Sequence, residues 1–238
     1  MSFLTTYFGT LVGGGGLLVT PILLAFGLPV PVALGTRRLS TLGGVLSSFI
    51  QFHRWKKIDY HLSIYLVTFA IIGSLLGYHF VDVVNEDLLK KIIGFFIVVL
   101  AIVLYFENTE KISKIKGKLY QYRKIIGPPL IAFSAGLPII VGGGGGTAFS
   151  YVLIVVYGQT ILQSAGNRKL SMLIGQVMAT IMFIRAGYVH YPLAFCMLFA
   201  NVLGGWFGSR FFLKKGDEKV RVFFFLIVVI LGLKTLFF

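Results

Sequence analysis

Long apolar stretches follow one another along this chain, and short polar gaps separate them. A helix of about 20 apolar residues spans the hydrocarbon core of a bilayer, which is about 30 Å thick. Eight stretches approach that length, and they leave little of the 238 residues over. They cover residues 2–26, 31–52, 62–80, 88–106, 125–141 with a continuation to 157, 161–184, 192–212 and 220–238. The pattern predicts an all-α polytopic membrane protein.

The composition excludes several other classes of protein. Charged residues make up 13% of the chain, whereas soluble domains carry about 25%. The net charge of +14 could suggest a nucleic-acid partner, but the basic residues lie in short gaps between apolar stretches and not on one polar face of a soluble fold. We therefore expect a lipid bilayer and no nucleic acid as partner. The single cysteine, Cys196, excludes an internal disulfide and a cysteine-based metal site.

The chain contains an internal repeat. A displacement of 131 positions, without a gap, superposes residues of the first half on identical or similar residues of the second half. The matched pairs include Gly13/Gly144, Gly27/Gly158, Gly35/Gly166, Arg37/Arg168, Ser40/Ser171, Phe52/Phe183, Tyr60/Tyr191, Gly73/Gly204 and Gly77/Gly208. This predicts a first repeat over 1–106, a basic linker over 107–124 and a second repeat over 125–238. Repeated helical bundles around a central site are a common plan of secondary transporters.

The orientation in the membrane is left open by the sequence. If all eight stretches span the bilayer, both termini and the linker lie on the same side of the membrane. The lysines of the linker would make that side cytoplasmic. Basic residues such as Lys90 and Lys214 then lie on the other side and weaken that assignment. If the two glycine-broken stretches instead dip in and return, each half has three spans and the halves are inverted.

Two glycine runs interrupt apolar stretches at corresponding places, Gly13–Gly16 and Gly142–Gly146. Each glycine costs a helix interior about 1 kcal/mol relative to alanine, so a run should break the helix. Unwound backbone in a membrane must be buried in protein or line a watery cavity. Half-helices beginning at Leu17 and Thr147 would present free N–H groups, which suit a small anion. The alternative is that the glycines only allow close helix packing.

A second constellation begins the next helix of each half. Gly35-Thr36-Arg37-Arg38-Leu39-Ser40 in the first half matches Gly166-Asn167-Arg168-Lys169-Leu170-Ser171 in the second. Cations inside apolar stretches usually face a cavity or a partner. All eight acidic residues lie in gaps or at the ends of stretches, so a bound anion is the expected counter-charge. Alternatively, these cations snorkel to the headgroups, as we expect of Arg54 and Arg185 at the far ends of the same helices.

These residues resemble a known family. Gly13 to Leu18 with Pro21, then Ala33-Leu34-Gly35-Thr36 and a basic-Leu-Ser continuation, resemble the first repeat of TauE/SafE-type membrane transporters, and the second half is similar. The resemblance covers nearly the whole chain. It implies a multi-pass permease of the cytoplasmic (inner) membrane with two four-segment repeats, associated with export of sulfite or of organosulfonates such as sulfoacetate. It also implies a basic residue in the site at Arg38 and at Lys169. Val152 departs from the proline found at Pro21.

The combined prediction is a secondary transporter that moves a small anion, sulfite or an organosulfonate, by alternating access between the repeats. The expected substrate-binding residues are Gly13, Gly14, Gly15, Gly16, Thr36, Arg38, Ser40, Gly143, Gly144, Gly145, Gly146, Thr147, Asn167, Lys169 and Ser171. A passive anion channel, an uptake permease for another small sulfur-containing or carboxylate anion, and a structural subunit remain alternatives. An enzyme is disfavoured, because the stretches hold no nucleophile with its base and no metal-ligand set. No catalytic residue, metal or cofactor is expected, and a homo-oligomer is left open.

Overall fold

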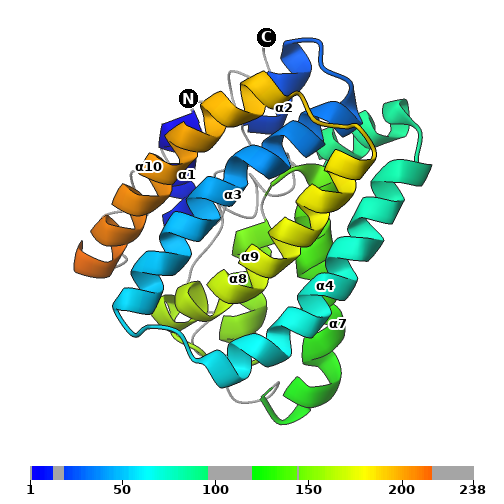
Figure 1. Ribbon diagram of the computed structural model, residues 1–238. Helices are drawn as coiled ribbons and strands as arrows, with labels where there is room; N and C mark the ends of the chain where they lie inside the picture. Colours follow the sequence, from blue (N-terminus) through cyan, green and yellow to red (C-terminus); the bar gives the residue numbers. More distant parts are fainter. Residues whose placement is uncertain (1, 13–18, 96–119, 144, 216–238) are drawn as a thin grey trace.

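The computed structural model describes residues 2–12, 19–95, 120–143 and 145–215, and all regular structure in these ranges is helical, as predicted (Figure 1). A helical stretch without a label covers residues 86–95. The labelled helices are α1 (Ser2–Val12), α2 (Val19–Ala25), α3 (Val30–Arg54), α4 (Tyr60–Val83), the short η2 (Tyr120–Tyr122), α7 (Arg123–Val141), α8 (Gly145–Val155), α9 (Ile161–Arg185) and α10 (Tyr191–Lys215). The predicted stretches 31–52, 62–80, 161–184 and 192–212 each lie within one helix. The stretch 220–238 and linker residues 107–119 lie outside the described ranges.

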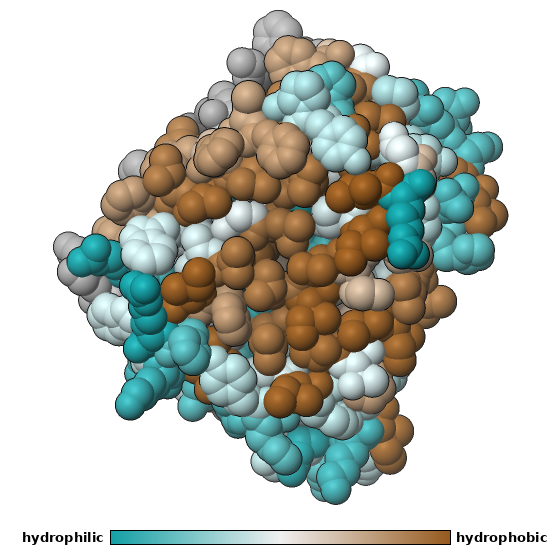
Figure 2. Space-filling view, viewed as in Figure 1, coloured by the Kyte–Doolittle hydropathy of each residue, from teal (hydrophilic) through white to brown (hydrophobic). Residues whose placement is uncertain are grey.

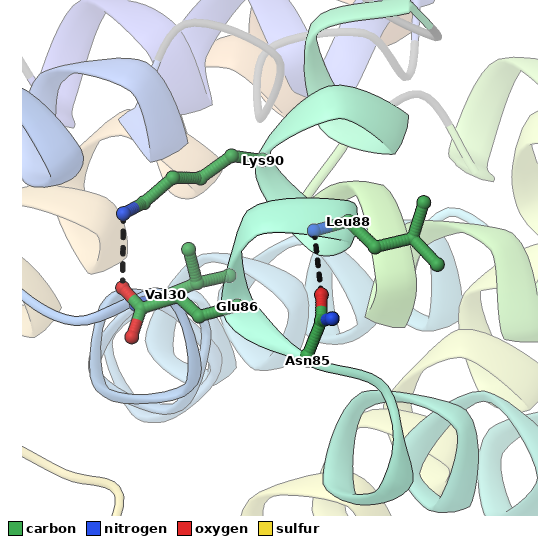
Figure 3. A network of polar contacts seen from close by, with 5 residues as sticks. All are labelled: Val30, Asn85, Glu86, Leu88 and Lys90. Carbon is green, nitrogen blue, oxygen red and sulfur yellow. Dashed lines mark hydrogen bonds and ion pairs between the residues drawn. The ribbon is translucent and has the colours of Figure 1, made fainter.

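Polar residues fix the ends of several helices. Thr160 and Gln163 form a reciprocal capping box at the start of α9, and the side chain of Asp59 accepts a hydrogen bond from the N–H of Leu62 at the start of α4. Figure 3 shows a similar arrangement at the start of the 86–95 helix, where Asn85 Oδ1 accepts from the N–H of Leu88 at 2.8 Å. Of these capping residues only Asp59 is acidic, and it lies at the end of a helix and not at the centre of the molecule.

Glu86 belongs to the same network and links two helices. Its Oε1 lies 3.1 Å from the N–H of Val30, the first residue of α3, and 3.4 Å from Lys90 Nζ (Figure 3). A carboxylate at a helix N-terminus satisfies a free N–H group and interacts favourably with the helix dipole. This carboxylate therefore stabilises the end of α3 and does not reach the cations deeper in the same helix.

The long helices of one half pack on helices of the other half. Helix α3 packs on α10 and α9, while α4 packs on α7 and α9 (Figure 1). Helices α3 and α9 are antiparallel, because the start of each lies against the loop that follows the other. The Cα of Gly35 faces the carbonyl group of Tyr188, beyond α9, and that of Gly166 faces the carbonyl group of Lys57, beyond α3. At both places a Cβ atom would collide with the carbonyl oxygen.

Hydrogen bonds accompany these two approaches. Thr36 Oγ1 accepts from the N–H of His190 at 2.9 Å, and Asn167 Oδ1 accepts from the N–H of Asp59 at 2.7 Å. We call these the α3-start contact and the α9-start contact. In the alignment of the two halves, which is displaced by 131 residues, Thr36 corresponds to Asn167 and His190 corresponds to Asp59. The accepting side chain comes from the first half in one contact and from the second half in the other. Related contacts therefore close the two opposite ends of the α3–α9 pair.

Helices α7 and α8 form a hairpin whose turn is the second glycine run. Helix α7 ends at Val141, Gly142 adopts the left-handed region with φ of 76°, and α8 begins at Gly145. Phe149 of α8 packs with Ile131 of α7, and further down the ring of Tyr157 lies against Gly127. Helix α8 therefore runs back along α7, and the chain after it lies beside the start of α7.

This hairpin bears out one prediction and refines another. The predicted break at Gly142–Gly146 is confirmed. The half-helix begins at Gly145 and not at Thr147. Its first turn packs on Pro138 so closely that a Cβ at Gly145 would collide with the proline ring. The first run, Gly13–Gly16, lies outside the described residues, between the end of α1 and the start of α2.

The outer surface suits a bilayer. Three helical stretches of the described chain are long and apolar enough to cross a membrane: Tyr60–Val83, Tyr120–Val141 and Tyr191–Phe211. Figure 2 shows apolar side chains across the middle of one face and hydrophilic ones gathered toward its upper right and lower left. Exposed aromatic side chains recur along α10 at Tyr191, Phe195, Phe199 and Phe207. The residues that face outward are thus those that hydrocarbon tolerates.

Candidate functional site

The most unusual feature of the interior is a set of buried cations on α3 and α9. The exposed fractions are 7% for Arg37, 5% for Arg38, 2% for Arg168 and 5% for Lys169. Snorkelling to the headgroups therefore does not describe these four residues, whereas Arg54 and Arg185 at the helix ends are exposed as expected. The one ion pair within the described ranges joins Lys90 to Glu86 at the surface. Burying a charge without a counter-charge costs several kcal/mol, so these cations need a functional explanation.

Arg38 is held by a glutamine of the other half. Arg38 Nη1 donates to Gln176 Oε1 at 2.7 Å, and Gln176 Nε2 donates back to the main-chain oxygen of Arg38 at 2.7 Å and to Thr41 Oγ1 at 2.6 Å. The Nε and Nη2 atoms of Arg38 are buried and have no hydrogen-bond partner among the described residues. An orphaned guanidinium edge in the interior indicates a place where a ligand or water binds.

Arg168 contacts the glycine turn directly. Its Nη1 donates to the main-chain oxygen of Gly146 in the first turn of α8. On the other side of the turn, Thr20 Oγ1 of α2 donates to the main-chain oxygen of Gly142 at 3.1 Å. The tip of the α7–α8 hairpin is thus fixed between α9 and the helix that follows the first glycine run.

A small cavity separates Arg38 from this tip. About 30 Å³ of it is open to the centres of water-sized spheres, more than the roughly 10–15 Å³ that one water molecule needs. It lies about midway along α4 and α9 and is lined by both polar and apolar residues. The lining consists of Arg38, Ala70, Ser74, Ser134, Ala135, Pro138, Gly145, Phe149, Ser171, Met172, Gly175 and Gln176.

The predicted site residues divide into three groups. Arg38, Gly145 and Ser171 line the cavity, and the main-chain oxygen of Gly146, the residue after Gly145, accepts a hydrogen bond from Arg168. Thr36 and Asn167 instead accept hydrogen bonds from loop amides in the two start contacts. Three other predicted residues have different surroundings: Ser40 Oγ donates to the oxygen of Arg37, Lys169 Nζ lies 5.3 Å from the centre of the Phe52 ring, and Gly143 is buried in the turn. The predicted residues that the structure does not describe are Gly13, Gly14, Gly15, Gly16, Gly144 and the side chain of Thr147.

Three polar residues of the cavity were absent from the predicted set: Gln176, Ser74 and Ser134. Gln176 stands out in the sequence as a neutral polar residue within a span, but nothing there distinguishes bonding to a substrate from bonding to another helix. Ser74 and Ser134 carry no sequence signal, because small hydroxyl residues are common where membrane helices pack. Their position becomes apparent only from the way the hairpin folds back.

The glycine turn provides a test of how tightly the site is built. Gly142→Ala should lower the apparent melting temperature in detergent, because a residue with φ of 76° is strained by about 1–2 kcal/mol when it carries a Cβ, and this Cβ would also collide with Thr20. Gly187→Ala is the matched control, since Gly187 has φ of 74° and a Cβ added to it would meet no atom within 4 Å. The Gly142 variant should lose more stability than the control; equal losses would show that the turn is loosely packed.

Comparisons with known proteins agree on one group. The family model described as sulfite exporter TauE/SafE matches residues 1–235. A probable membrane transporter protein of Haemophilus influenzae is 27% identical over 224 residues, which are 93% of this chain and 86% of the relative. The probable membrane transporter protein YfcA of Escherichia coli K12 is 27% identical over 241 residues, 100% of this chain and 87% of the relative. YdhB of Bacillus subtilis, with the same description, is 25% identical over 229 residues, 94% of this chain and 92% of the relative. No solved structure matches significantly.

Proposed function

Because this chain belongs to the TauE/SafE family of membrane transporters, we propose that it is a secondary transporter that carries a small oxyanion through the cavity beside Arg38. The observation that carries this proposal is the guanidinium of Arg38, which is buried, lines the cavity and has two nitrogens without a partner in the described chain. A bound oxyanion would satisfy both the charge and the free donors. Ser171 and the start of α8 would complete its surroundings.

The sign of the buried charge supports an anion. Arg37, Arg38, Arg168 and Lys169 are all cationic, and no carboxylate of the described chain pairs with them. A cation would be repelled, and a relay of protons between carboxylates has no members among the described cavity residues. Attraction between an anion and these charges is strong because the surroundings have a low dielectric constant.

The substrate that we propose is sulfite or an organosulfonate. The family description names sulfite, and the cavity adds a chemical argument of its own. Ala70, Ala135, Phe149 and Met172 line the cavity together with the polar residues, so a short organic substituent would find apolar contacts there. We place the protein in the cytoplasmic membrane as a multi-pass permease.

Alternating access would follow from two inverted repeats. The exchange of roles between the α3-start and α9-start contacts, and the antiparallel course of α3 and α9, support this arrangement. Transporters built in this way bind substrate near the midplane, where broken helices end.

Reconstitution into proteoliposomes tests the proposal. We expect saturable flux of sulfite or methanesulfonate that depends on the protein, with protein-free liposomes and the Arg54→Met variant as controls. Arg54 is a suitable control residue because it lies on the same helix but is exposed at its end. Equal flux with and without protein would contradict the proposal, and a macroscopic anion conductance would favour the channel.

A further inference from the structure

Gln176 makes a closed set of hydrogen bonds around Arg38. Its Oε1 accepts from Arg38 Nη1, and its Nε2 donates to the oxygen of Arg38 and to Thr41 Oγ1. The orientation of the amide is determined by its neighbours, because a guanidinium can only donate and a carbonyl oxygen can only accept. Thr41 Oγ1 in turn donates to the oxygen of Arg37 at 2.9 Å. The glutamine therefore has one stable orientation, and it fixes the end of the guanidinium at Nη1.

The two nitrogens of Arg38 that Gln176 does not contact lie on one edge of the guanidinium group. In a guanidinium, the N–H of Nε and one N–H of Nη2 lie on the same edge and point in parallel, which matches two oxygens of a carboxylate-like group. In Arg38, Nε and Nη2 are the two nitrogens without a partner in the described chain. The edge that remains free is thus the one suited to bidentate recognition.

We propose that Gln176 is a specificity-determining positioning residue: by holding Nη1 of Arg38, it presents the Nε/Nη2 edge to two oxygens of one oxyanion, so that the site selects sulfonate-like anions over halides. This inference rests on the proposed function of the cavity. A halide offers one centre to the two donors, whereas a sulfonate or sulfite offers two oxygens and makes two charge-assisted hydrogen bonds.

The other half of the chain has neither an arginine nor a glutamine at the positions that correspond to Arg38 and Gln176. At a displacement of 131 residues, Arg38 corresponds to Lys169 and Gln176 corresponds to Val45. An ammonium group is a point charge with no planar edge, and valine has no acceptor. Lys169 Nζ accordingly lies over the ring of Phe52. Lys169 and Val45 therefore cannot reproduce the recognition of two oxygens that we propose for Arg38 and Gln176.

The test measures binding of methanesulfonate and chloride to the purified full-length protein, by calorimetry at constant ionic strength. The wild type should prefer methanesulfonate. Arg38→Lys, which keeps the charge and removes the edge, should reduce this preference about tenfold, the value of one charge-assisted hydrogen bond. Gln176→Leu should reduce it by a similar factor. Gln176→Glu, nearly isosteric, should weaken binding of both anions, because its carboxylate neutralises Arg38. Gln51→Leu, another buried glutamine of a long helix, should leave the preference unchanged.

The outcomes separate this inference from the proposed function. If the wild type binds no methanesulfonate, sulfite or chloride, the proposed function fails. If the wild type binds methanesulfonate but Gln176→Leu or Arg38→Lys retains its full preference over chloride, the function stands and the inference about Gln176 is overturned. Should Gln176→Leu not fold, Arg38→Lys still tests the free edge of the guanidinium, and Gln176→Glu tests the contact with Arg38. A Gln176→Glu variant that binds both anions as tightly as the wild type would overturn the role of Gln176.

Discussion

Replacing Arg38 by Met should abolish anion binding while leaving the anion-free protein at least as stable as the wild type. Two buried charge-assisted hydrogen bonds of about 1.5–3 kcal/mol each correspond to a loss of about 100-fold or more in affinity. Removing the charge relieves a desolvation cost of several kcal/mol, since Arg38 is 5% exposed and has no carboxylate partner in the described chain. The orphaned Gln176 amide costs only about 1–3 kcal/mol in return.

The measurement is thermal unfolding in detergent with and without methanesulfonate, because a ligand that binds the native state raises the apparent stability. Arg38→Met should melt at or above the wild-type temperature and show no shift on adding the anion. Arg54→Met, at the exposed end of α3, should retain the shift. A variant that melts lower and still responds to methanesulfonate would mean that Arg38 has a structural role.

A large loss of stability is expected at Gly35 and Gly166. A methyl group at either position would collide with a main-chain carbonyl, of Tyr188 or of Lys57, and a loop backbone cannot yield as a flexible side chain can. Such overpacking should cost about 3 kcal/mol or more in each Ala variant. Because the two approaches are related by the displacement of 131 residues, the two losses should be similar.

Apparent melting temperatures of Gly35→Ala and Gly166→Ala check this expectation. Gly94→Ala is the control, since Gly94 lies in a helical stretch with no atom near its Cβ position, and it should be neutral or stabilising by up to about 1 kcal/mol. If all three variants melt together, then the close packing of α3 and α9 against these loops is not rigid.

Local features of the sequence were sufficient to predict the helices and one of their breaks. The apolar stretches locate α3, α4, α9 and α10, because helix length and apolar composition are set by the bilayer. The second glycine run predicts the turn between α7 and α8, because each of its residues destabilises a helix. The absence of acidic residues from the stretches likewise points to cations without partners, which the described structure contains.

Features that depend on tertiary packing could not be predicted in the same way. The apolar character of 125–157 fits a crossing helix and a returning hairpin equally, and the contact of Phe149 with Ile131 distinguishes them. The sequence assigns Arg38 and Lys169 the same role, yet Lys169 lies against Phe52 while Arg38 lines the cavity. The hydrogen-bond partners of Gln176 depend on how α3 and α9 pack against each other, and no short sequence pattern predicts that packing.

The α3-start and α9-start contacts have an energetic consequence for a carrier. Each is a single hydrogen bond between a side chain and a loop amide, with a net value of about 1 kcal/mol. They lie at opposite ends of the same helix pair, so, in the alternating access that we propose, opening the cavity to one compartment would break one contact and keep the other. Two conformations with opposite sidedness would then differ little in free energy, and a concentration gradient of the cargo would be enough to bias their exchange.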